Sequence, residues 1–293
     1  MSTTISNRDS RFSSEPLLVS WIHGSESAKH NTDPELQIHW YDPHTVILRQ
    51  NMAVNYEAPF LYLLFGENRA MLIDTGATSD PEFFPLRQTV DEIMASWLAL
   101  HPRAHYELVV LHSHAHGDHV AGDAQFQDRP GTILVGADQT STWSFLGFDA
   151  HPSAIRHMDL GGREVLALAT PGHDAAAITY YDPWTGLLLT GDTVYRGRLY
   201  IEDWHAFAAT IDRLVEFSAQ HPVTHVLGCH IEMSQTPGVD YPVRSTFHPQ
   251  EAPLEMSVAH LLEIRDAIAH VGTVPTRVTA NDFILWPDPD ELD

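Results

Sequence analysis

The first half of the chain alternates short apolar runs with one stretch of helical spacing. The runs are β-branched or aromatic and predict strands, at residues 38–41, 45–50, 60–66, 70–76 and 106–111. Between the last two, residues 85–100 place apolar side chains three and four positions apart, which predicts an amphipathic helix. This order predicts a first sheet with a helix packed on it.

The second half repeats the pattern. Strand-like runs occur at residues 132–135, 155–158, 164–169, 177–181, 187–190 and 224–227. Helical spacing occurs at residues 138–148, 203–219 and 254–270. Two mixed sheets packed face to face, with helices outside, would bury all of these apolar faces. The predicted fold class is α/β, as a four-layer αβ/βα sandwich.

The pattern also predicts how the chain is divided. Residues 1–35 are polar and rich in Ser, Asn, Asp and His, which predicts a loosely packed lead-in. Residues 36–293 contain no linker and are expected to form a single domain that includes a C-terminal helix. Residues 231–253 hold many turn formers and no clear period, so we expect a long loop at the rim of a site.

Charge and composition exclude several classes of partner. The chain has 16 basic and 39 acidic residues and a formal net charge of −23, which disfavours nucleic acid and anionic membranes. It has no apolar stretch long enough to span a bilayer and no apolar leader at its start, so a cytoplasmic location is expected. The single cysteine, Cys229, allows no internal disulfide and is expected to be a buried, inert thiol.

The densest group of chemically capable residues follows the predicted strand at 106–111. The stretch HSHAHGDHVAG places His114, His116, Asp118 and His119 within six positions. Buried imidazoles and carboxylates need partners, and at this density the expected common partner is a cation. His114 and His116 alternate on an extended backbone, while Asp118 and His119 lie beyond a glycine bend, so the two pairs are suited to different metal ions.

Three later residues repeat the same arrangement, in which a metal-capable side chain follows a strand. They are His173 in TPGH, Asp192 in TGD and His230 in GCH. Each alone has an ordinary interpretation, as a surface histidine or a helix cap. Together with the HxHxDH stretch they predict one metal site at the ends of several strands.

These motifs, with LIDTG at 72–76, resemble the metallo-β-lactamase-fold hydrolase superfamily over roughly residues 37–232. The resemblance implies a dinuclear site: His114, His116 and His173 for metal 1, Asp118, His119 and His230 for metal 2, and Asp192 bridging both. Asp74, within LIDTG, matches the aspartate that orients ligands in this family. Imidazole and carboxylate ligands without thiolate favour zinc and also suit iron or manganese.

Departures from the family's patterns narrow the subfamily. True β-lactamases of this superfamily lack the bridging carboxylate, whereas Asp192 is present here. Flavodiiron oxygen reductases have glutamate where this chain has His116. Glyoxalase II members share the GDT sequence, but no clear basic cluster for glutathione carboxylates follows. Acyl-homoserine lactone lactonases place a tyrosine three positions after the bridging aspartate, where this chain has Tyr195.

The resulting hypothesis is a hydrolase that uses a metal-bound hydroxide to cleave a small carbonyl substrate, an ester, lactone, thioester or amide. Asp118 and Tyr195 are its candidate catalytic residues, with Asp118 orienting the hydroxide or shuttling its proton. Two alternatives remain open: a mononuclear iron dioxygenase resembling persulfide dioxygenases, and a β-lactamase-like amide hydrolase. A binding protein with a decayed site is disfavoured, because decayed sites usually lose ligands.

Overall fold

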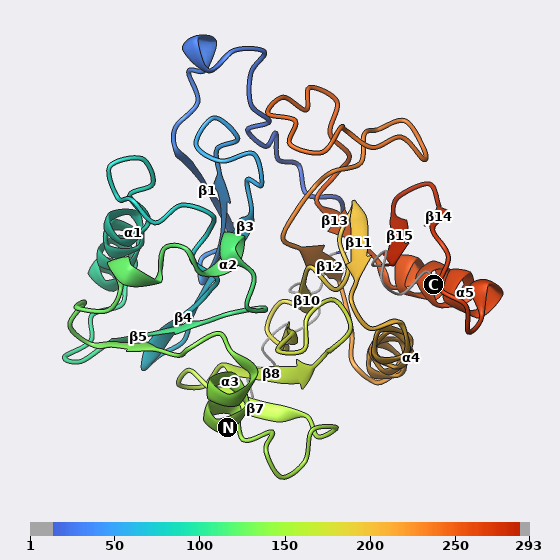
Figure 1. Cartoon of the computed structure of the whole chain (residues 1–293). Helices are drawn as coiled ribbons and strands as arrows, with labels where there is room; N and C mark the ends of the chain where they lie inside the picture. The colour runs from blue at the N-terminus through green and yellow to red at the C-terminus, as the bar shows by residue number, and fades with distance from the viewer. Residues whose placement is uncertain (1–13, 288–293) are drawn as a thin grey trace, which may run out of the picture.

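The computed structural model describes residues 14–287, in which two six-stranded sheets face each other (Figure 1). Sheet 1 has the strand order β1-β2-β3-β4-β5-β6. Its strands are β1 (Leu36–Asp42), β2 (Thr45–Gln50), β3 (Phe60–Phe65), β4 (Arg69–Ile73), β5 (Glu107–Leu111) and β6 (Thr132–Leu134). The first four pair antiparallel and the last two join in parallel, so the sheet is mixed.

Sheet 2 has the order β13-β12-β10-β9-β8-β7. Its strands are β7 (Arg156–Asp159), β8 (Glu164–Ala169), β9 (Ile178–Asp182), β10 (Leu187–Gly191), β12 (His225–Gly228) and β13 (Glu255–Met256). Only β10 and β12 pair in parallel, across the connection that contains helix α4 (Trp204–Gln220). The other pairs are antiparallel.

Three buried clusters of apolar side chains separate four layers. The central cluster lies between the sheets and includes Tyr62 and Tyr180. A second joins sheet 1 to α1 (Leu86–Leu100), and a third joins sheet 2 to α4 and α5 (Val258–Val271). Helices therefore cover the outer face of each sheet, and the predicted αβ/βα sandwich is confirmed.

The structure changes some of the predicted elements. The helix expected over 254–270 begins only at Val258, because Glu255 and Met256 pair with β12 and Ser257 caps the helix. The helix expected over 138–148 is α3 (Gln139–Leu146), and the HxHxDH stretch adds the single turn α2 (Gly117–Val120). Short 3₁₀ turns, η1 (Ala28–His30) and η2 (Asp123–Gln125), were not predicted.

A third, small sheet was also missed. It consists of β11 (Arg198–Ile201), β15 (Ile284–Pro287) and β14 (Val278–Thr279), in the order β11-β15-β14. β11 pairs in parallel with a strand from the far end of the chain. A four-residue strand of this kind carries too little periodicity to be recognised before its partner is known.

The segment before β1 contributes to the central core where it is described. Trp21 is buried there, edge-on to Phe60. Leu17 donates its N–H to Glu255 on β13, and Gln37 on β1 accepts from the N–H of Ile22. Residues 14–23 thus contact the edge strands of both sheets. The first 13 residues of the predicted lead-in lie outside the described residues.

The loops after β4, β5, β10 and β12 meet at one end of the sandwich. Asp74, directly after β4, has a positive φ of 68°, which an aspartate tolerates better than most residues. Gly191 closes β10 with a φ of 53°, and a Cβ there would lie 2.6 Å from the Cβ of Ser113. This close approach brings the end of β10 against the HxHxDH loop. Among residues 14–287, no helix is long and apolar enough to cross a bilayer.

Candidate metal centre

The structure brings all seven predicted ligands to the end of the sandwich where these loops meet. They form two groups whose ligand atoms lie within 4.8 Å of one another, His114 with His116 and His173, and Asp118 with His119, Asp192 and His230. The ligands come from the loops after β5, β8, β10 and β12, as the strand-end pattern predicted. Most of them are buried; His116 and Asp118 are partly exposed.

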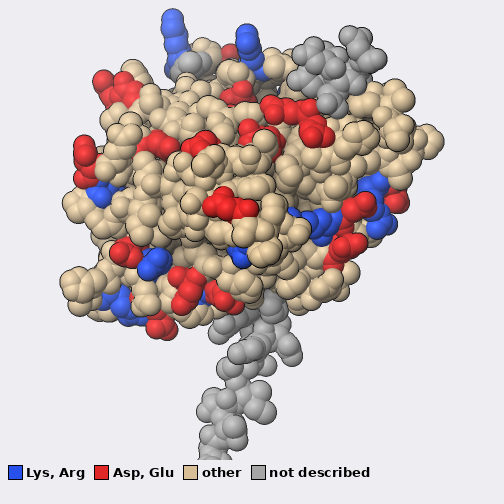
Figure 2. Space-filling model, turned by 60° about the horizontal axis from the view of Figure 1, so that its bottom comes forward, with Lys and Arg blue, Asp and Glu red and all other residues tan. Residues whose placement is uncertain are grey.

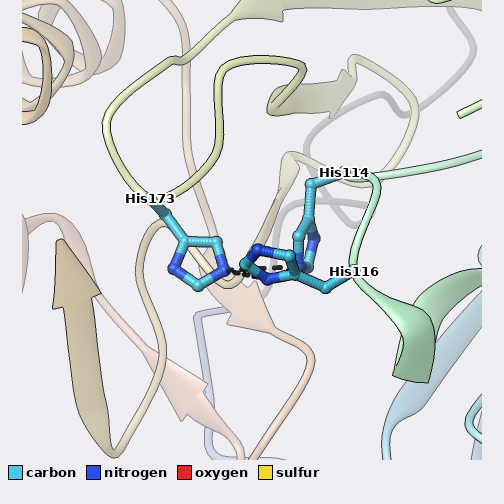
Figure 3. A group of neighbouring side chains, drawn as sticks. All are labelled: His114, His116 and His173. Atoms are coloured by element: carbon cyan, nitrogen blue, oxygen red, sulfur yellow. Dashed lines mark hydrogen bonds between the residues drawn. The ribbon is translucent and has the colours of Figure 1, made fainter. Parts of the chain in front are cut away.

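Three imidazole nitrogens converge in the first group (Figure 3). Nε2 of His114 lies 3.0 Å from Nδ1 of His116 and 3.2 Å from Nε2 of His173, which is 3.1 Å from Nδ1 of His116. Each ring nitrogen either donates one proton or accepts one, so at least two of the three are of the same kind. Hydrogen bonds therefore cannot satisfy this triangle. Nitrogens around one tetrahedral zinc ion would lie about 3.3 Å apart.

The second group mixes imidazole and carboxylate. Oδ2 of Asp118 lies 3.2 Å from Nε2 of both His119 and His230, and these two nitrogens are 3.3 Å apart. Oδ2 of Asp192 lies 3.3 Å from Nε2 of His230, and its Oδ1 lies 3.6 Å from Nε2 of His119.

Asp192 stands between the two groups. Besides its contacts in the second group, its Oδ2 lies 3.9 Å from Nε2 of His173, in the first. Its Oδ1 is buried and has no hydrogen-bond partner among the described residues. A buried carboxylate oxygen without a donor is costly, and a cation is the partner that this geometry suits. The residues present therefore fit two metal ions with Asp192 between them.

In His173 and His230, the hydrogen bond of the outward ring nitrogen determines whether the inward nitrogen carries a proton or a lone pair. Nδ1 of His173 donates to the Tyr200 carbonyl and Nδ1 of His230 to the Glu57 carbonyl, both at 2.8 Å. A carbonyl only accepts, so in the neutral rings both Nε2 atoms carry lone pairs. Lone pairs aimed at carboxylates repel them unless a positive charge lies between, as in a metal site.

Asp74, to which the LIDTG resemblance assigns an orienting role, contacts residues at both ends of the HxHxDH stretch. Its Oδ2 lies 2.9 Å from Nδ1 of His119 and accepts from the Ser113 hydroxyl at 2.8 Å. Its Oδ1 accepts the Ser113 N–H at 2.7 Å. The side chain is completely buried. Asp74 thus holds both the ring of His119 and the backbone that precedes His114.

The pKa directions agree with a site that attracts cations. Burial, with the neighbouring His119, holds the pKa of His114 well below its ordinary value. Burial also opposes protonation of His119 and His230, but Asp192 outweighs it and raises the pKa of both rings well above the ordinary value. Burial would raise the pKa of Asp118, yet His119 and His230 lower it. The carboxylates therefore draw positive charge between them.

The sequence model of the metallo-beta-lactamase superfamily matches residues 57–230, which include the HxHxDH stretch and the three later ligands. The chain belongs to the metallo-beta-lactamase superfamily. The predicted resemblance is confirmed, and the chain is accordingly a hydrolase.

Known members of the superfamily are similar in sequence or in fold. Hydroxyacylglutathione hydrolases of Brucella ovis and Brucella abortus are each 26% identical over 216 residues, covering 71% of this chain and 80% of each relative. A metallo-beta-lactamase from Pontibacter korlensis superposes with a TM-score of 0.52 at 16% identity, over 80% of this chain and 99% of that one. DIM-1 metallo-beta-lactamase gives 0.52 at 14% identity, over 83% and 100%. The two structures share the fold.

Other predicted residues lie around the superfamily's metal site. The Cys229 thiol is buried, and burial raises its pKa to about 12, which suits an inert thiol. Tyr195 is buried with its ring 5.7 Å from that of His230. Its hydroxyl donates to the Arg198 carbonyl and also lies 3.1 Å from Oε2 of Glu232. The Tyr195 hydroxyl is therefore engaged with residues other than the ligands.

A small pocket opens beside the second group of ligands. Its volume is about 180 Å³, and its wall includes His230, Tyr56, Tyr200, Val243 and Arg244. Part of this wall comes from residues 231–253, which were predicted to form a loop at the rim of a site. Within them the structure has only isolated bridges, such as Met233 with Asp240.

Sequence reasoning missed the groups that support the ligands from outside. Tyr200 and Glu57 act through backbone carbonyls, which any residue type supplies, so no sequence signal marks them. Ser113 was also missed, although its place directly before the predicted ligand His114 was a signal. Asp174 was missed too, although it directly follows the predicted ligand His173.

Proposed function

We propose that this chain is a dinuclear metal-dependent hydrolase of small carbonyl substrates. The observation that carries the proposal is the pair of ligand groups with Asp192 between them, whose Oδ1 no described residue satisfies. His114, His116 and His173 would hold metal 1, Asp118, His119 and His230 metal 2, with Asp192 bridging. Zinc suits this ligand set best, and iron or manganese also suit it. When bound, the two ions activate water and polarise a carbonyl oxygen.

Asp118 is the proposed catalytic carboxylate. Its Oδ2 lies between His119 and His230, and the side chain keeps 21% of its surface exposed, whereas His119 is fully buried. It is thus the ligand of the second group most open to solvent. A carboxylate in this place can orient an attacking water and accept its proton.

The prediction that Tyr195 is catalytic remains a prediction. The contacts of its hydroxyl with Arg198 and Glu232 support a role in holding the ring against His230. Tyr200 lies on the pocket wall, and its hydroxyl accepts from Nε of Arg198 at 2.9 Å. Because an arginine only donates, the Tyr200 proton stays available to a bound molecule, so Tyr200 is the better placed of the two to contact substrate.

We expect a neutral or weakly charged acyl substrate. Arg244, exposed on the pocket wall, forms no ion pair among the described residues, which leaves room for a single negative charge in the pocket. Arg198 on its wall is already paired with Glu232, at 2.6 Å, and with Asp240. Its charge is thus balanced within the protein. Figure 2 shows acidic side chains spread across the face in view, with basic ones scattered among them. Together with the net charge of −23, this supports the expectation that polyanions such as RNA are poor substrates.

The similar proteins suggest two acyl classes to test first. The Brucella relatives are named for hydrolysing hydroxyacylglutathione, and the two similar structures are named as β-lactamases. Of the four proposed classes, thioesters and, among the amides, β-lactams are therefore to be tested first, followed by esters and lactones. Testing amides also tests the β-lactamase-like alternative. Asp192 favours esters, lactones and thioesters instead, because true β-lactamases of this superfamily lack the bridging carboxylate.

The test is metal analysis of protein purified without chelator, followed by a substrate screen. We expect two divalent ions per chain and hydrolysis of at least one of the four acyl classes, abolished by chelator and restored by Zn²⁺, Mn²⁺ or Fe²⁺. One iron per chain, with oxygen consumption on a persulfide and no hydrolysis, would establish the dioxygenase alternative instead. Cleavage of RNA at physiological salt in preference to all acyl compounds would refute the substrate proposal.

A further inference from the structure

The outward nitrogen of His116 is held differently from those of the other four histidines at the proposed metal centre. In those four, it meets a group of the protein within hydrogen-bonding distance: Ser113 Oγ for His114 at 3.0 Å, Asp74 for His119, and backbone carbonyls for His173 and His230. His116 instead turns Nδ1 toward His114 and His173, whose rings lie beside its own in Figure 3, and this leaves Nε2 on the other side of the ring.

Two carboxylates face that Nε2. Oε1 of Glu202 lies 3.4 Å away and Oδ2 of Asp174 lies 3.8 Å away. The side chain of His116 is 37% exposed, that of Asp174 15% and that of Glu202 54%. No lysine or arginine forms an ion pair with either carboxylate among the described residues. Both charges therefore act on His116.

Backbone contacts place both of these residues beside His116. Asp174 directly follows His173, and its Oδ1 accepts the Ala176 N–H at 2.6 Å, which leaves Oδ2 directed at His116. Glu202 directly follows β11, and its N–H donates to the Gly172 carbonyl at 2.8 Å. A Cβ on Gly172 would lie 2.5 Å from Cα of Phe207, so the turn before His173 is also pressed against α4.

We propose that Glu202, together with Asp174, is a positioning residue for His116. The carboxylate attracts the proton of the ring to Nε2, which keeps the lone pair on Nδ1, the atom that faces His114 and His173. It also makes Nδ1 a stronger donor to a cation, because a negative charge stands behind the ring. This inference rests on the proposed function, since it assigns His116 to metal 1.

The inference predicts a specific defect in Glu202→Ala. Its backbone contact to Gly172 remains, so the chain should fold with an unchanged melting temperature. We expect the affinity for one of the two Zn²⁺ ions, the one that His116 binds, to fall roughly 10-fold to 100-fold. A chelator competition that resolves the two ions measures this. Because Glu202 is half exposed, the loss should shrink at high salt. Glu216→Ala, at an exposed position on α4, is the matched control and should change nothing.

Two further readouts separate positioning from a merely structural role. In the protein loaded with Co²⁺, Glu202→Ala should alter the visible absorption bands of the metal, and Glu202→Asp should restore them in part. In the metal-free protein, the ¹⁵N shifts of His116 should show a proton on Nε2 in the wild type and a mixture of tautomers in Glu202→Ala. The double variant Glu202→Ala/Asp174→Asn should enlarge both changes.

The outcomes distinguish this inference from the proposed function. If the wild type binds two metals and hydrolyses an acyl substrate, while Glu202→Ala keeps wild-type affinity, spectrum and tautomer, only the positioning role is overturned. If the wild type binds no metal, both are overturned, because His116 then has no metal ion to hold.

Discussion

Buried charged groups lie at both ends of β9 and β10. At one end they satisfy one another by hydrogen bonds, and at the other they do not. At one end, Arg163 and Asp182 are fully buried. All three guanidinium nitrogens of Arg163 donate: to both carboxylate oxygens of Asp182, to Thr45 Oγ1 and to the carbonyls of His44 and Phe65. Each donor has an acceptor, and the network joins sheet 1 to sheet 2.

At the other end, buried polar groups face others that cannot satisfy them. Three ring nitrogens converge around His114, and Oδ1 of Asp192 has no partner among the described residues. Burial and charge are common to both ends, so neither marks a functional site. The mark is several polar groups that converge in one place without satisfying one another, because single buried atoms without a partner, such as Nε of Arg49, also occur elsewhere among the described residues.

The largest effect on stability is expected at the satisfied end. Arg163→Met leaves the Asp182 carboxylate buried without its counter-charge, which should lower the free energy of unfolding by about 3–5 kcal/mol. Chemical denaturation measures this. Metal content of the folded fraction should stay at the wild-type value, because the pair lies at the opposite end of the strands from the ligands.

A matched double variant sharpens that result. Arg163→Met/Asp182→Leu removes both charges and should recover much of the lost stability, since an apolar pair carries no desolvation cost. Equal destabilisation in the single and double variants would mean that hydrogen bonds matter more here than charge, those of Arg163 to the two carbonyls and those that Asp182 accepts from Thr185 and the Trp184 N–H.

At the mismatched end, the largest effect is expected on turnover. Asp192→Ala should keep the fold, weaken binding of metal 2 and lower kcat by at least ~100-fold, the scale of losing one electrostatic element at the reacting centre. Asp192→Asn should do nearly as much damage, because the amide keeps the shape and loses the charge. Near-normal turnover with two metals bound would show that Asp192 is only the cap of a strand end.

A substitution at Asp74 tests whether a carboxylate that lies outside the two ligand groups also contributes to metal affinity. Its positive φ of 68° is tolerated by asparagine better than by alanine, so Asp74→Asn isolates the charge without straining the backbone. We expect metal affinity to fall roughly 10-fold or more, because His119 loses the carboxylate behind its ring. Calorimetric titration with Zn²⁺ measures this. An unchanged affinity in Asp74→Asn would reduce Asp74 to a hydrogen-bond acceptor for Ser113.

Sequence reasoning reached the sandwich and the convergence of the ligand loops, because both depend on local signals. Apolar runs mark the strands, and His173, Asp192 and His230 each follow one. The third sheet escaped, since β11 becomes a strand only by pairing with β15, which comes from the far end of the chain. Ring orientation escaped as well. Nothing in HAHGDH states that His116 presents Nδ1 while His114 presents Nε2, because that depends on rotamers set by packing.

The last test concerns the pH dependence of stability, at a charge pair that lies between the two cases. Arg49 donates from two nitrogens to Glu251 at 2.6 Å, while its Nε has no hydrogen-bond partner among the described residues. Burial would raise the pKa of Glu251, but Arg49 outweighs it and the pKa is lowered.

A carboxylate with a lowered folded pKa stabilises the fold above its unfolded pKa of about 4.3, and that contribution is lost as the pH falls through the folded value. Glu251→Gln should therefore be less stable than the wild type at pH 7, and the two free energies of unfolding should converge as the solution is acidified below about pH 4. Glu216→Gln, at an exposed position, should follow the wild-type curve throughout. A difference in the free energy of unfolding between Glu251→Gln and the wild type that stays constant from pH 7 to acid would contradict this. In that case Glu251 contributes shape and hydrogen bonding, and its charge does not stabilise the fold.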